Sequence, residues 1–377
     1  MRLSVLQENL KRGLGIVGRA VATRSTLPIT QNVLLSTDRS MLKLSATNLE
    51  IGITTWVGAM VEEEGSITVP ARLLSDFVDS LPAERIDLNV TQRPKAVQLS
   101  CARSEASING TDAEEFPPIP TVEEGLAAKL DVRKLRTAIG QVAFAAATEE
   151  SRPVLTGVKL ELDGDDFTMA AADGFRLAVH KEKLVEPVAE SASVIIPAKT
   201  LNEISRLLGE QDEPVEMMMS SAKGQALFQL KSIEVVSQLI QGAFPNYGQL
   251  IPQSYQTRAV FDLQEFQRAA RTASIFARDG SGIVRLQVVP GEDGAQGKIV
   301  ISARAEEVGE HTDEIDTEIE GDEAKIAFSN RYLLDVLGVL ERGQVALEAT
   351  SPSSPGVFRP TTTEDYVHVV MPMFVQW

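Results

Sequence analysis

The sequence repeats one short pattern three times, at intervals of about 130 residues. Each copy begins with a few strand-forming residues and continues into a helical pattern that opens with a cation. An acid follows four residues after that cation. The copies are Thr68–Phe77, Ile195–Ile204 and Ala327–Val336. A chain with an internal repeat is built from similar units, so this feature constrains the fold before any other does.

Three further sets of segments recur in the same order. Two sets have the pattern of strands, and the third has apolar residues at helical spacing. The sets are Met41–Glu50, Asp166–Phe175 and Gly297–Glu306; Asn32–Thr37, Gly157–Leu162 and Ile283–Val288; and Gln7–Ala22, Asp131–Ala146 and Asp262–Ala277. Four sets in one register predict three homologous domains, which we place at residues 1–121, 122–252 and 253–377.

Two segments that begin with Phe-Pro, Phe116–Gly125 and Phe244–Gln256, lie where the first two domains should end, and we interpret them as linkers. A turn is also expected at Pro290–Gly297. Each repeat then has the order helix, strands, helix, strands, which predicts an α+β fold with mainly antiparallel sheets. Tandem domains of this kind leave sheet edges exposed at both ends. Head-to-tail pairing of such edges gives a ring or a filament.

The composition favours a protein of a reducing compartment. A single cysteine, Cys101, permits no internal disulfide. The first residues lack the apolar core of a signal peptide, and we find no stretch of about 18 apolar residues. We therefore expect a cytoplasmic protein with no membrane partner.

The net charge of −17 at first argues against a nucleic-acid partner, since Lys and Arg supply the affinity for phosphates. The distribution of charge changes this view. The six expected helices together carry 14 cations and 9 acids, so they have a net charge of +5 and the rest of the chain −22. The sequence predicts a mildly basic helical surface on an acidic body, although solvated helix faces alone give similar patterns. These helices are residues 7–22, 71–80, 131–146, 198–209, 262–278 and 330–342.

Several segments carry a family resemblance: Ser25–Leu35, Thr47–Ile51, Thr68–Arg72, Ala172–Val179, Phe244–Pro252 and Tyr366–Met373. Together they resemble the bacterial DNA polymerase III β subunits, the sliding clamps, over essentially the whole chain. The resemblance implies a non-catalytic homodimeric ring without cofactors, with helices inside, sheets outside, and double-stranded DNA in the hole. It also implies association with the nucleoid and three kinds of protein partner: the DNA polymerase III α subunit, the clamp loader, and other proteins with clamp-binding motifs.

The resemblance also implies site residues. The positions for sequence-independent DNA contact are Arg24, Arg72, Arg133, Lys134, Arg136, Lys199, Arg206, Arg268 and Arg271. The positions for a partner-peptide groove between the second and third domains are Leu155, Gly174, Phe175, Arg176, Leu177, Pro245, Gln249, Leu250, Tyr332, Val369, Met371, Pro372 and Met373. The positions for the dimer contact are Arg103, Ile108, Ile275, Phe276, Glu306 and Glu307.

Three groove positions depart from the family pattern, because Ala172, Phe175 and Gln249 stand where other residues are common. A more apolar groove with a shifted motif preference follows from these departures. Flexible methionines suit a pocket that accepts varied ligands, although Met371 and Met373 also fit an ordinary core strand. Trp377 lies about two residues beyond the usual ending, either at the groove rim or in a frayed terminus.

Other readings of the sequence explain less. His180, His311 and His368 lack metal-ligand spacing, and we find no phosphate-binding glycine motif. Asp173 fits a general base, but it fits better a turn residue that accepts bonds from its own backbone. A specialised clamp paralogue, for example one that protects against a clamp-directed inhibitor, stays open as the alternative.

Overall fold

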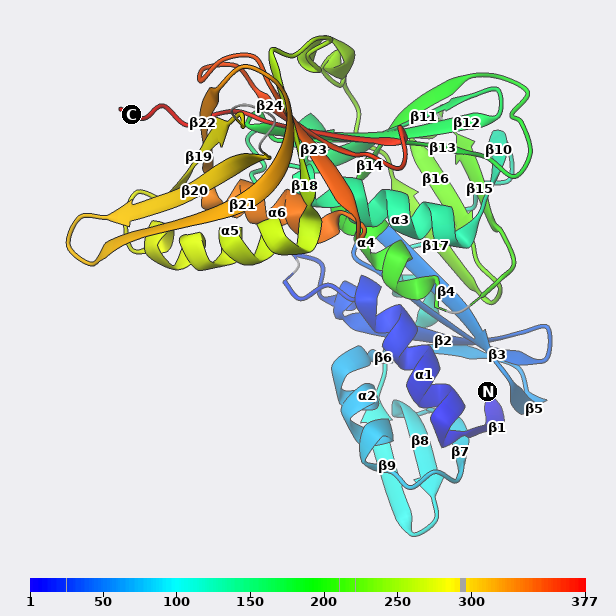
Figure 1. Ribbon diagram of the computed structural model, residues 1–377. Helices are drawn as coiled ribbons and strands as arrows, with labels where there is room; N and C mark the ends of the chain where they lie inside the picture. The colour runs from blue at the N-terminus through cyan, green and yellow to red at the C-terminus, as the bar shows by residue number, and fades with distance from the viewer. Residues whose placement is uncertain (25, 210, 221, 292–295) are drawn as a thin grey trace. The chain divides into compact units, whose positions relative to one another are not determined.

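The computed structural model describes all residues except 25, 210, 221 and 292–295. The described residues contain six α-helices, two in each repeat, at the predicted places (Figure 1). They are α1 (Gln7–Val17), α2 (Ala71–Ser80), α3 (Val132–Val142), α4 (Ala198–Leu207), α5 (Leu263–Arg278) and α6 (Asn330–Val339). The turn predicted at Pro290–Gly297 includes residues outside the described part of the chain.

Several predicted helices extend too far. The pattern that predicts a helix to Ala22 covers α1 and a separate 3-10 turn at Gly18–Ala20. In the same way, α3 is followed by the 3-10 turn Ala143–Ala145. The start of α5 was predicted well because Asp262 caps the helix, with its carboxylate accepting from the Glu265 amide at 2.9 Å.

Contacts group the chain into two compact units. The first comprises Met1–Val132, Leu184–Glu190 and Glu203–Leu239. It contains a five-stranded sheet in the order β5-β1-β7-β8-β9 and an eight-stranded sheet in the order β10-β15-β16-β17-β4-β3-β2-β6. Their strands are β1 (Arg2–Leu6), β2 (Asn32–Asp38), β3 (Met41–Thr47), β4 (Ile51–Val57), β5 (Ala59–Glu63), β6 (Ser66–Pro70), β7 (Arg85–Gln92), β8 (Lys95–Cys101), β9 (Ser104–Asn109), β10 (Leu126–Leu130), β15 (Val215–Ser220), β16 (Gln225–Gln229) and β17 (Ile233–Gln238).

The second unit comprises Arg133–Lys183, Ser191–Asn202 and Ile240–Trp377. Its twelve-stranded sheet has the order β14-β11-β12-β13-β25-β24-β23-β18-β21-β20-β19-β22. The strands are β11 (Gly157–Asp163), β12 (Asp166–Ala172), β13 (Arg176–Lys183), β14 (Ala192–Pro197), β18 (Thr257–Asp262), β19 (Ile283–Val289), β20 (Gly297–Ala305), β21 (Gly309–Gly321), β22 (Ala324–Ser329), β23 (Gln344–Ala349), β24 (Gly356–Pro360) and β25 (Tyr366–Val370).

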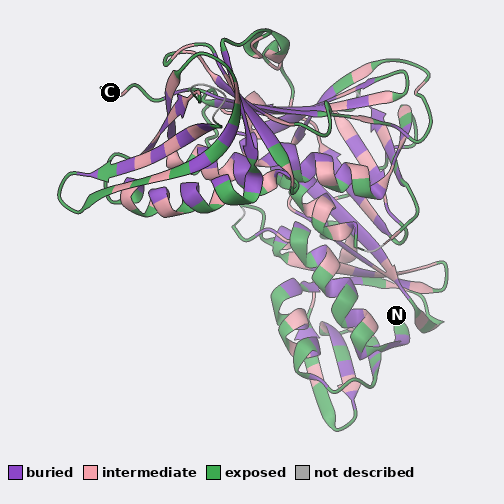
Figure 2. Cartoon of the chain, in the orientation of Figure 1, coloured by how far each residue is buried: buried purple, intermediate pink, exposed green. Residues whose placement is uncertain are grey.

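The sheets are antiparallel, as the short connections predict, and helices cover one face of them. In the first unit α1 packs on β3 and β4 and buries Leu10 and Leu14. In the second unit α5 runs along β19–β21 and buries Phe266, whose ring stacks on Phe261 at 4.2 Å. Figure 2 shows the buried residues where helices and strands face each other, and exposed residues at the far end of the β20–β21 hairpin.

Strand pairing joins consecutive repeats. In the first unit β4 pairs antiparallel with β17, with Ile53 opposite Val235. In the second unit β13 pairs antiparallel with β25, with Val179 opposite Val367. Both pairings join the third strand after a repeat's first helix to the last strand of the next repeat. The repeats are therefore fused through continuous sheets and not only through linkers.

One backbone hydrogen bond recurs in all three repeats and closes each copy. The carbonyls of Thr68, Ile195 and Ala327 lie at equivalent positions on the edge strands β6, β14 and β22. Each accepts from an amide in the segment that follows its repeat's last strand: Thr111 at 2.9 Å, Ile240 at 2.9 Å and Met373 at 2.7 Å. This bond caps an edge that would otherwise expose unpaired backbone groups.

The repeated cation–acid pairs do not behave alike. In the first copy Arg72 Nε lies 3.8 Å from the Asp76 carboxylate. In the second copy Glu203 accepts from Arg19 at 2.9 Å and also from Arg206. In the third copy Asp335 accepts from Arg176 on β13. The shared spacing thus places an acid on the helix face, and tertiary contacts then decide its partner.

Two buried histidines make the fold sensitive to acid. His368 stacks on Phe144 at 5.4 Å, and burial followed by the charge of Arg176 lowers its pKa to about 3. Burial also lowers the pKa of His180 below its usual 6.5. Because the unfolded chain binds these protons first, stability is fully present above pH 6.5 and falls as the pH drops from there toward 3.

We expect the free energy of unfolding, and with it the urea midpoint, to be lower at pH 5.0 than at pH 7.5. His368 should account for about 2 kcal/mol of the difference. His368→Phe keeps a ring against Phe144 and should make this pH dependence shallower, while His180 retains part of it. The comparison is made by circular dichroism at both pH values. A His368→Phe slope equal to that of the wild type would contradict the assignment.

Candidate functional site

The turn between β12 and β13 has a fixed geometry. Asp173 Oδ1 accepts from the amides of Phe175 at 2.9 Å and Arg176 at 3.0 Å, so Asp173 is the turn residue that the sequence favours. Gly174 has a φ of +94°, and a Cβ added there would lie 2.9 Å from Arg152 Nη1. Glycine is needed at this position for its conformation. The turn therefore presents the neighbouring Phe175 and Arg176 in one orientation.

Arg176 is the central side chain of the site, and its side chain is only 4% exposed. Its Nε donates to Asp173 at 3.0 Å, Nη1 to Asp335 at 2.5 Å, and Nη2 to the Phe144 carbonyl at 2.8 Å. The guanidinium also lies 5.2 Å from the Phe144 ring and 4.7 Å from the Tyr332 ring. Two carboxylates and two ring faces thus compensate a charge that burial alone would penalise. The contacts tie the turn to α6 and to the segment after α3.

An apolar floor lies beside this turn. Leu177 and Val369, which are cross-strand partners on β13 and β25, belong to a buried cluster with Ala170, Ala172, Val179, Val357 and Val367. Tyr247 and Ile251, from the segment around the 3-10 turn Tyr247–Leu250, pack against the same cluster. The linker predicted at Phe244–Gln256 is thus part of the site.

Tyr247 is held at its polar end as well. Its hydroxyl donates to Glu161, and its ring lies 5.4 Å from the Lys159 ammonium. Lys159 in turn pairs with Glu161 at 2.7 Å. Burial, together with the neighbouring Glu161, raises the pKa of Tyr247, so the phenol keeps its proton and its hydrogen bond over the physiological range. This anchors the linker on β11.

Exposed apolar side chains surround the floor. Phe175 is 56% exposed, Leu250 51%, Met371 44% and Met373 39%. Phe175 stacks on Tyr332 at 6.3 Å, and its carbonyl accepts from the Met371 amide at 2.8 Å. Surface hydrophobics usually occur singly, so a set of this kind around a buried floor points to a ligand surface.

All thirteen groove positions implied by the resemblance fall in the second unit. The contacts above bring together Gly174, Phe175, Arg176, Leu177, Tyr332, Val369 and Met371. Leu155 is half-buried in the 3-10 turn Pro153–Thr156, Pro245 and Gln249 lie exposed near Leu250, and Pro372 is buried between the methionines. Sequence reasoning missed Phe144, Tyr247 and Asp335 as site residues. Tyr247 was nevertheless inside a motif segment, and Asp335 was one of the repeated acids.

A cavity of about 160 Å³ lies beside the same turn. Arg152, Asp173, Arg176 and Tyr332 line it together with the segment Ala146–Glu149. Its wall shares residues with the apolar surface, so the two form one continuous site. We use the name groove for the apolar floor, its exposed rim and this cavity.

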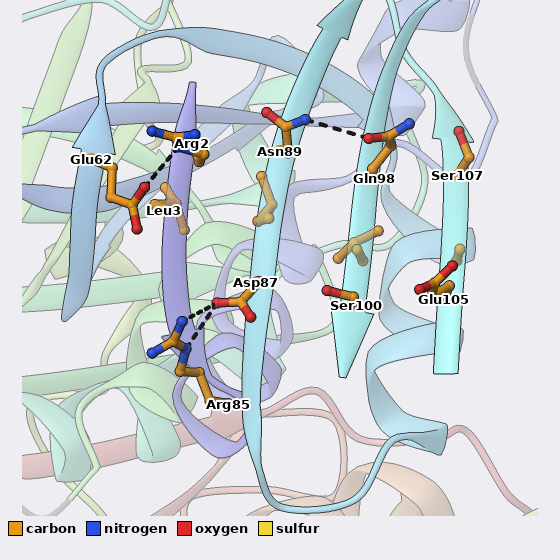
Figure 3. Close-up of a pocket in the computed structure, with 13 residues that line it drawn as sticks. Arg2, Leu3, Glu62, Arg85, Asp87, Asn89, Gln98, Ser100, Glu105 and Ser107 are labelled. Carbon is orange, nitrogen blue, oxygen red and sulfur yellow. Dashed lines mark hydrogen bonds and ion pairs between the residues drawn. The ribbon is translucent and has the colours of Figure 1, made fainter. Parts of the chain in front are cut away.

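A separate concave surface in the first unit lies on the five-stranded sheet, with a cavity of about 570 Å³ (Figure 3). Four of its charged side chains form two ion pairs: Arg2 Nε lies 2.7 Å from Glu62, and Arg85 Nη2 lies 2.7 Å from Asp87. Asn89 also donates to Gln98 at 3.4 Å.

Across the described residues, no cluster of three or more His, Cys, Asp or Glu is placed to hold a metal ion. In the same part of the chain, no helix has the length and apolar character needed to cross a membrane.

The cations implied for DNA contact lie mostly on helices and are mostly exposed. Arg72, Arg133, Arg136, Lys199, Arg206, Arg268 and Arg271 are exposed on α2, α3, α4 and α5, and Arg24 is exposed in the segment after α1. Lys134 differs, because it is half-buried and its ammonium lies 2.7 Å from Glu182. Arg206 shares Glu203 with Arg19. These ion pairs moderate the positive charge of the helical surface.

The residues implied for the dimer contact lie on α5, between β20 and β21, and in and beside β9. Ile275 is exposed on α5, while Phe276 is half-buried and stacks on His311 of β21 at 5.6 Å. Glu306 and Glu307 are exposed between β20 and β21. Arg103 is exposed in the turn before β9. Ile108 on β9 is buried within its own chain, which leaves mainly its backbone for an external contact.

Replacing Arg176 by alanine should destabilise the protein by about 3 kcal/mol, because it leaves Asp173 and Asp335 without their shared partner in a partly buried site. Arg176→Lys should recover little, since an ammonium cannot reproduce the guanidinium fork. Thermal unfolding provides the measurement, and Arg331→Ala, an exposed arginine of the same site, is the matched control. Equal midpoints for Arg176→Ala and Arg331→Ala would contradict this role.

Comparison with known proteins accounts for the whole chain. Residues 1–120, 129–246 and 248–374 match the N-terminal, central and C-terminal domains of the DNA polymerase III beta subunit family.

The beta sliding clamp of Bacillus subtilis strain 168 is 30% identical over 383 residues, with 99% of each chain covered. The beta sliding clamp of Synechococcus elongatus is 31% identical over 376 residues with the same coverage. The crystal structure of the DNA polymerase sliding clamp from Bacillus subtilis matches with a TM-score of 0.94 at 30% identity over 100% of both chains. Its counterpart from Pseudomonas aeruginosa matches with a TM-score of 0.91 at 30% identity over 99% of this chain and 100% of its own. This chain, an α+β protein of three clamp domains, belongs to the bacterial DNA polymerase III β subunit family of sliding clamps.

Proposed function

We propose that two copies of this chain form a closed ring around duplex DNA and tether the replicative DNA polymerase to it. The observation that carries the proposal is the repeated pairing of β4 with β17 and of β13 with β25. The equivalent of β4 and β13 in the third repeat is β21. The equivalent of β17 and β25 in the first repeat is β9. β9 is the last strand of its sheet, and Gly309–Thr317 of β21 pairs with β20 on one side. Pairing of β21 in one copy with β9 in another would continue the pattern and close a ring.

The helical cations fit a surface that guides DNA without gripping it. Many strong phosphate contacts would give steep salt dependence and slow movement along the duplex. The exposed arginines and lysines supply a moderate attraction that carries no sequence information, and the ion pairs of Lys134 and Arg206 reduce it further. Processivity then depends on topology. We infer no catalytic role and no cofactor, and we place the protein in the cytoplasm at the nucleoid.

The groove supports binding of short, partly apolar peptide segments from partner proteins. Its floor is apolar and preformed, and a few polar groups around the Asp173 turn fix orientation, as in many ligand sites. The rim methionines can repack around different side chains. We propose as partners the DNA polymerase III α subunit, the clamp loader and other proteins with clamp-binding motifs. Phe175 and Ala172 make this groove favour apolar contacts.

The comparisons do not favour the alternative of a specialised clamp paralogue. The matched relatives are named beta sliding clamps, and the match covers 99% of each chain.

The ring proposal predicts retention on circular DNA. Protein assembled on a nicked circular plasmid by the clamp loader and ATP should stay bound during gel filtration at about 0.5 M salt, since a topological link does not depend on phosphate contacts. It should be lost after the plasmid is cut once. Equal retention on circular and linear DNA would contradict the topological link.

The matched control for this experiment is Ile275→Asp with Phe276→Asp. Burying these charges at the proposed contact is unfavourable, so the variant should be a monomer by light scattering and should be lost from circular DNA. A dimeric variant would show that the contact lies elsewhere.

The groove proposal predicts that Met371→Ala with Met373→Ala weakens binding of a labelled peptide from the polymerase α subunit by at least about tenfold, because two exposed apolar side chains of the rim are lost. Fluorescence anisotropy gives the affinity, and light scattering should show an unchanged dimer. Met60→Ala, a change at an exposed methionine of the first unit, serves as control. Unchanged peptide binding in the double variant would remove the groove assignment.

A further inference from the structure

The segment after β25 is fixed at two points although it forms neither helix nor strand. The Met371 amide donates to the Phe175 carbonyl at 2.8 Å, and the Met373 amide donates to the Ala327 carbonyl on β22 at 2.7 Å. Pro372 is buried between them, while both methionine side chains stay exposed. The two bonds therefore hold the methionine part of the rim against two different elements.

The bond to Ala327 is the third member of the repeated closing bonds. In the first two copies the chain beyond the bond is held by apolar packing: Phe116 and Val122 are buried after Thr111, and Tyr247 packs on the apolar floor after Ile240. Beyond Met373 the residues are Phe374, Val375, Gln376 and Trp377. Val375 is half-buried, while Phe374 and Trp377 are exposed.

The Trp377 ring contacts the two strands beside this segment. Its ring lies 6.0 Å from the Arg285 guanidinium and 6.0 Å from the Lys325 ammonium. Arg285 is the cross-strand partner of Ala327, the residue that accepts from Met373, and Lys325 lies two positions before Ala327 on the same strand. Arg285 alternates with buried residues along β19, and Lys325 is the cross-strand partner of Gln287, two positions from Arg285, so both cations lie on the same face of the sheet. The ring thus lies beside the residues that hold Met373.

We infer that Trp377 is a positioning residue for the groove, an inference that rests on the proposed peptide-binding function. Its ring, attracted by Arg285 and Lys325, keeps Met373 bonded to Ala327 and so presents Met371 and Met373 in a fixed arrangement. A peptide that binds to a pre-ordered rim does not have to order it. Without the ring, the peptide has to order the segment as it binds.

Phe374 provides an internal contrast. It lies in the same segment and has an aromatic ring, but it is 86% exposed. Phe374→Ala removes a comparable side chain and leaves the Trp377 contact in place, so it is the matched control for Trp377→Ala.

The first measurement tests the ordering and needs no peptide. In the full-length protein labelled with ¹⁵N-methionine, hydrogen exchange of the Met373 amide should be about fivefold faster in Trp377→Ala, because both of its long, exposed cation–π contacts are lost. Phe374→Ala should exchange like the wild type, and Trp377→Phe, which keeps a ring, should lie closer to the wild type than Trp377→Ala. Equal exchange in Trp377→Ala and the wild type overturns the inference.

The second measurement tests the consequence for binding. Affinity for the labelled α-subunit peptide should fall about threefold to tenfold in Trp377→Ala, while Phe374→Ala stays at the wild-type value. Arg285→Ala with Lys325→Ala should cause the same loss, and adding Trp377→Ala to that pair should cause no further loss, because the residues act as one unit. Faster exchange with unchanged affinity overturns the positioning role. If the wild type itself does not bind the peptide, the proposed groove fails, and the exchange rates still decide whether Trp377 orders the segment.

Discussion

Antiparallel pairing between strands of consecutive repeats is the constraint on which the rest of this structure depends. Where β4 meets β17 and β13 meets β25, one sheet continues from repeat to repeat, and the backbone groups of two edges are satisfied together. A one-residue slip would turn every side chain of a strand to the other face. The pairing therefore also fixes Leu177 opposite Val369, and with them the floor of the groove.

Much of this architecture could be predicted from the sequence because it follows from local periodicity. The six helices and the antiparallel strands lie where the repeat places them, and Asp173 forms the turn that its position favours. Helix ends were less predictable. Apolar spacing continues through the 3-10 turns after α1 and α3, so it does not mark where the α-helical hydrogen bonds stop.

The parts that local pattern could not reveal depend on residues far apart in the chain. Asp335 has the same spacing to Arg331 as Asp76 has to Arg72, yet it binds Arg176, which is 159 positions away. The positive charge of the helices was counted correctly from the sequence, but its strength at the surface depends on pairs such as Lys134 with Glu182. The groove positions likewise came from a family resemblance, whereas Phe144 and Tyr247 required coordinates.

The groove combines a rigid part with an adaptable part, and the two have different physical origins. Arg176 is fixed by two carboxylates, a carbonyl and two rings, so the turn that carries Phe175 has little freedom. The methionines have flexible side chains on a backbone held by single hydrogen bonds at Phe175 and Ala327. A site of this kind can keep one docking geometry while it accepts varied side chains. Its selectivity then depends on how firmly the backbone of the methionine segment is held, and in this chain that is where Trp377, Arg285 and Lys325 act.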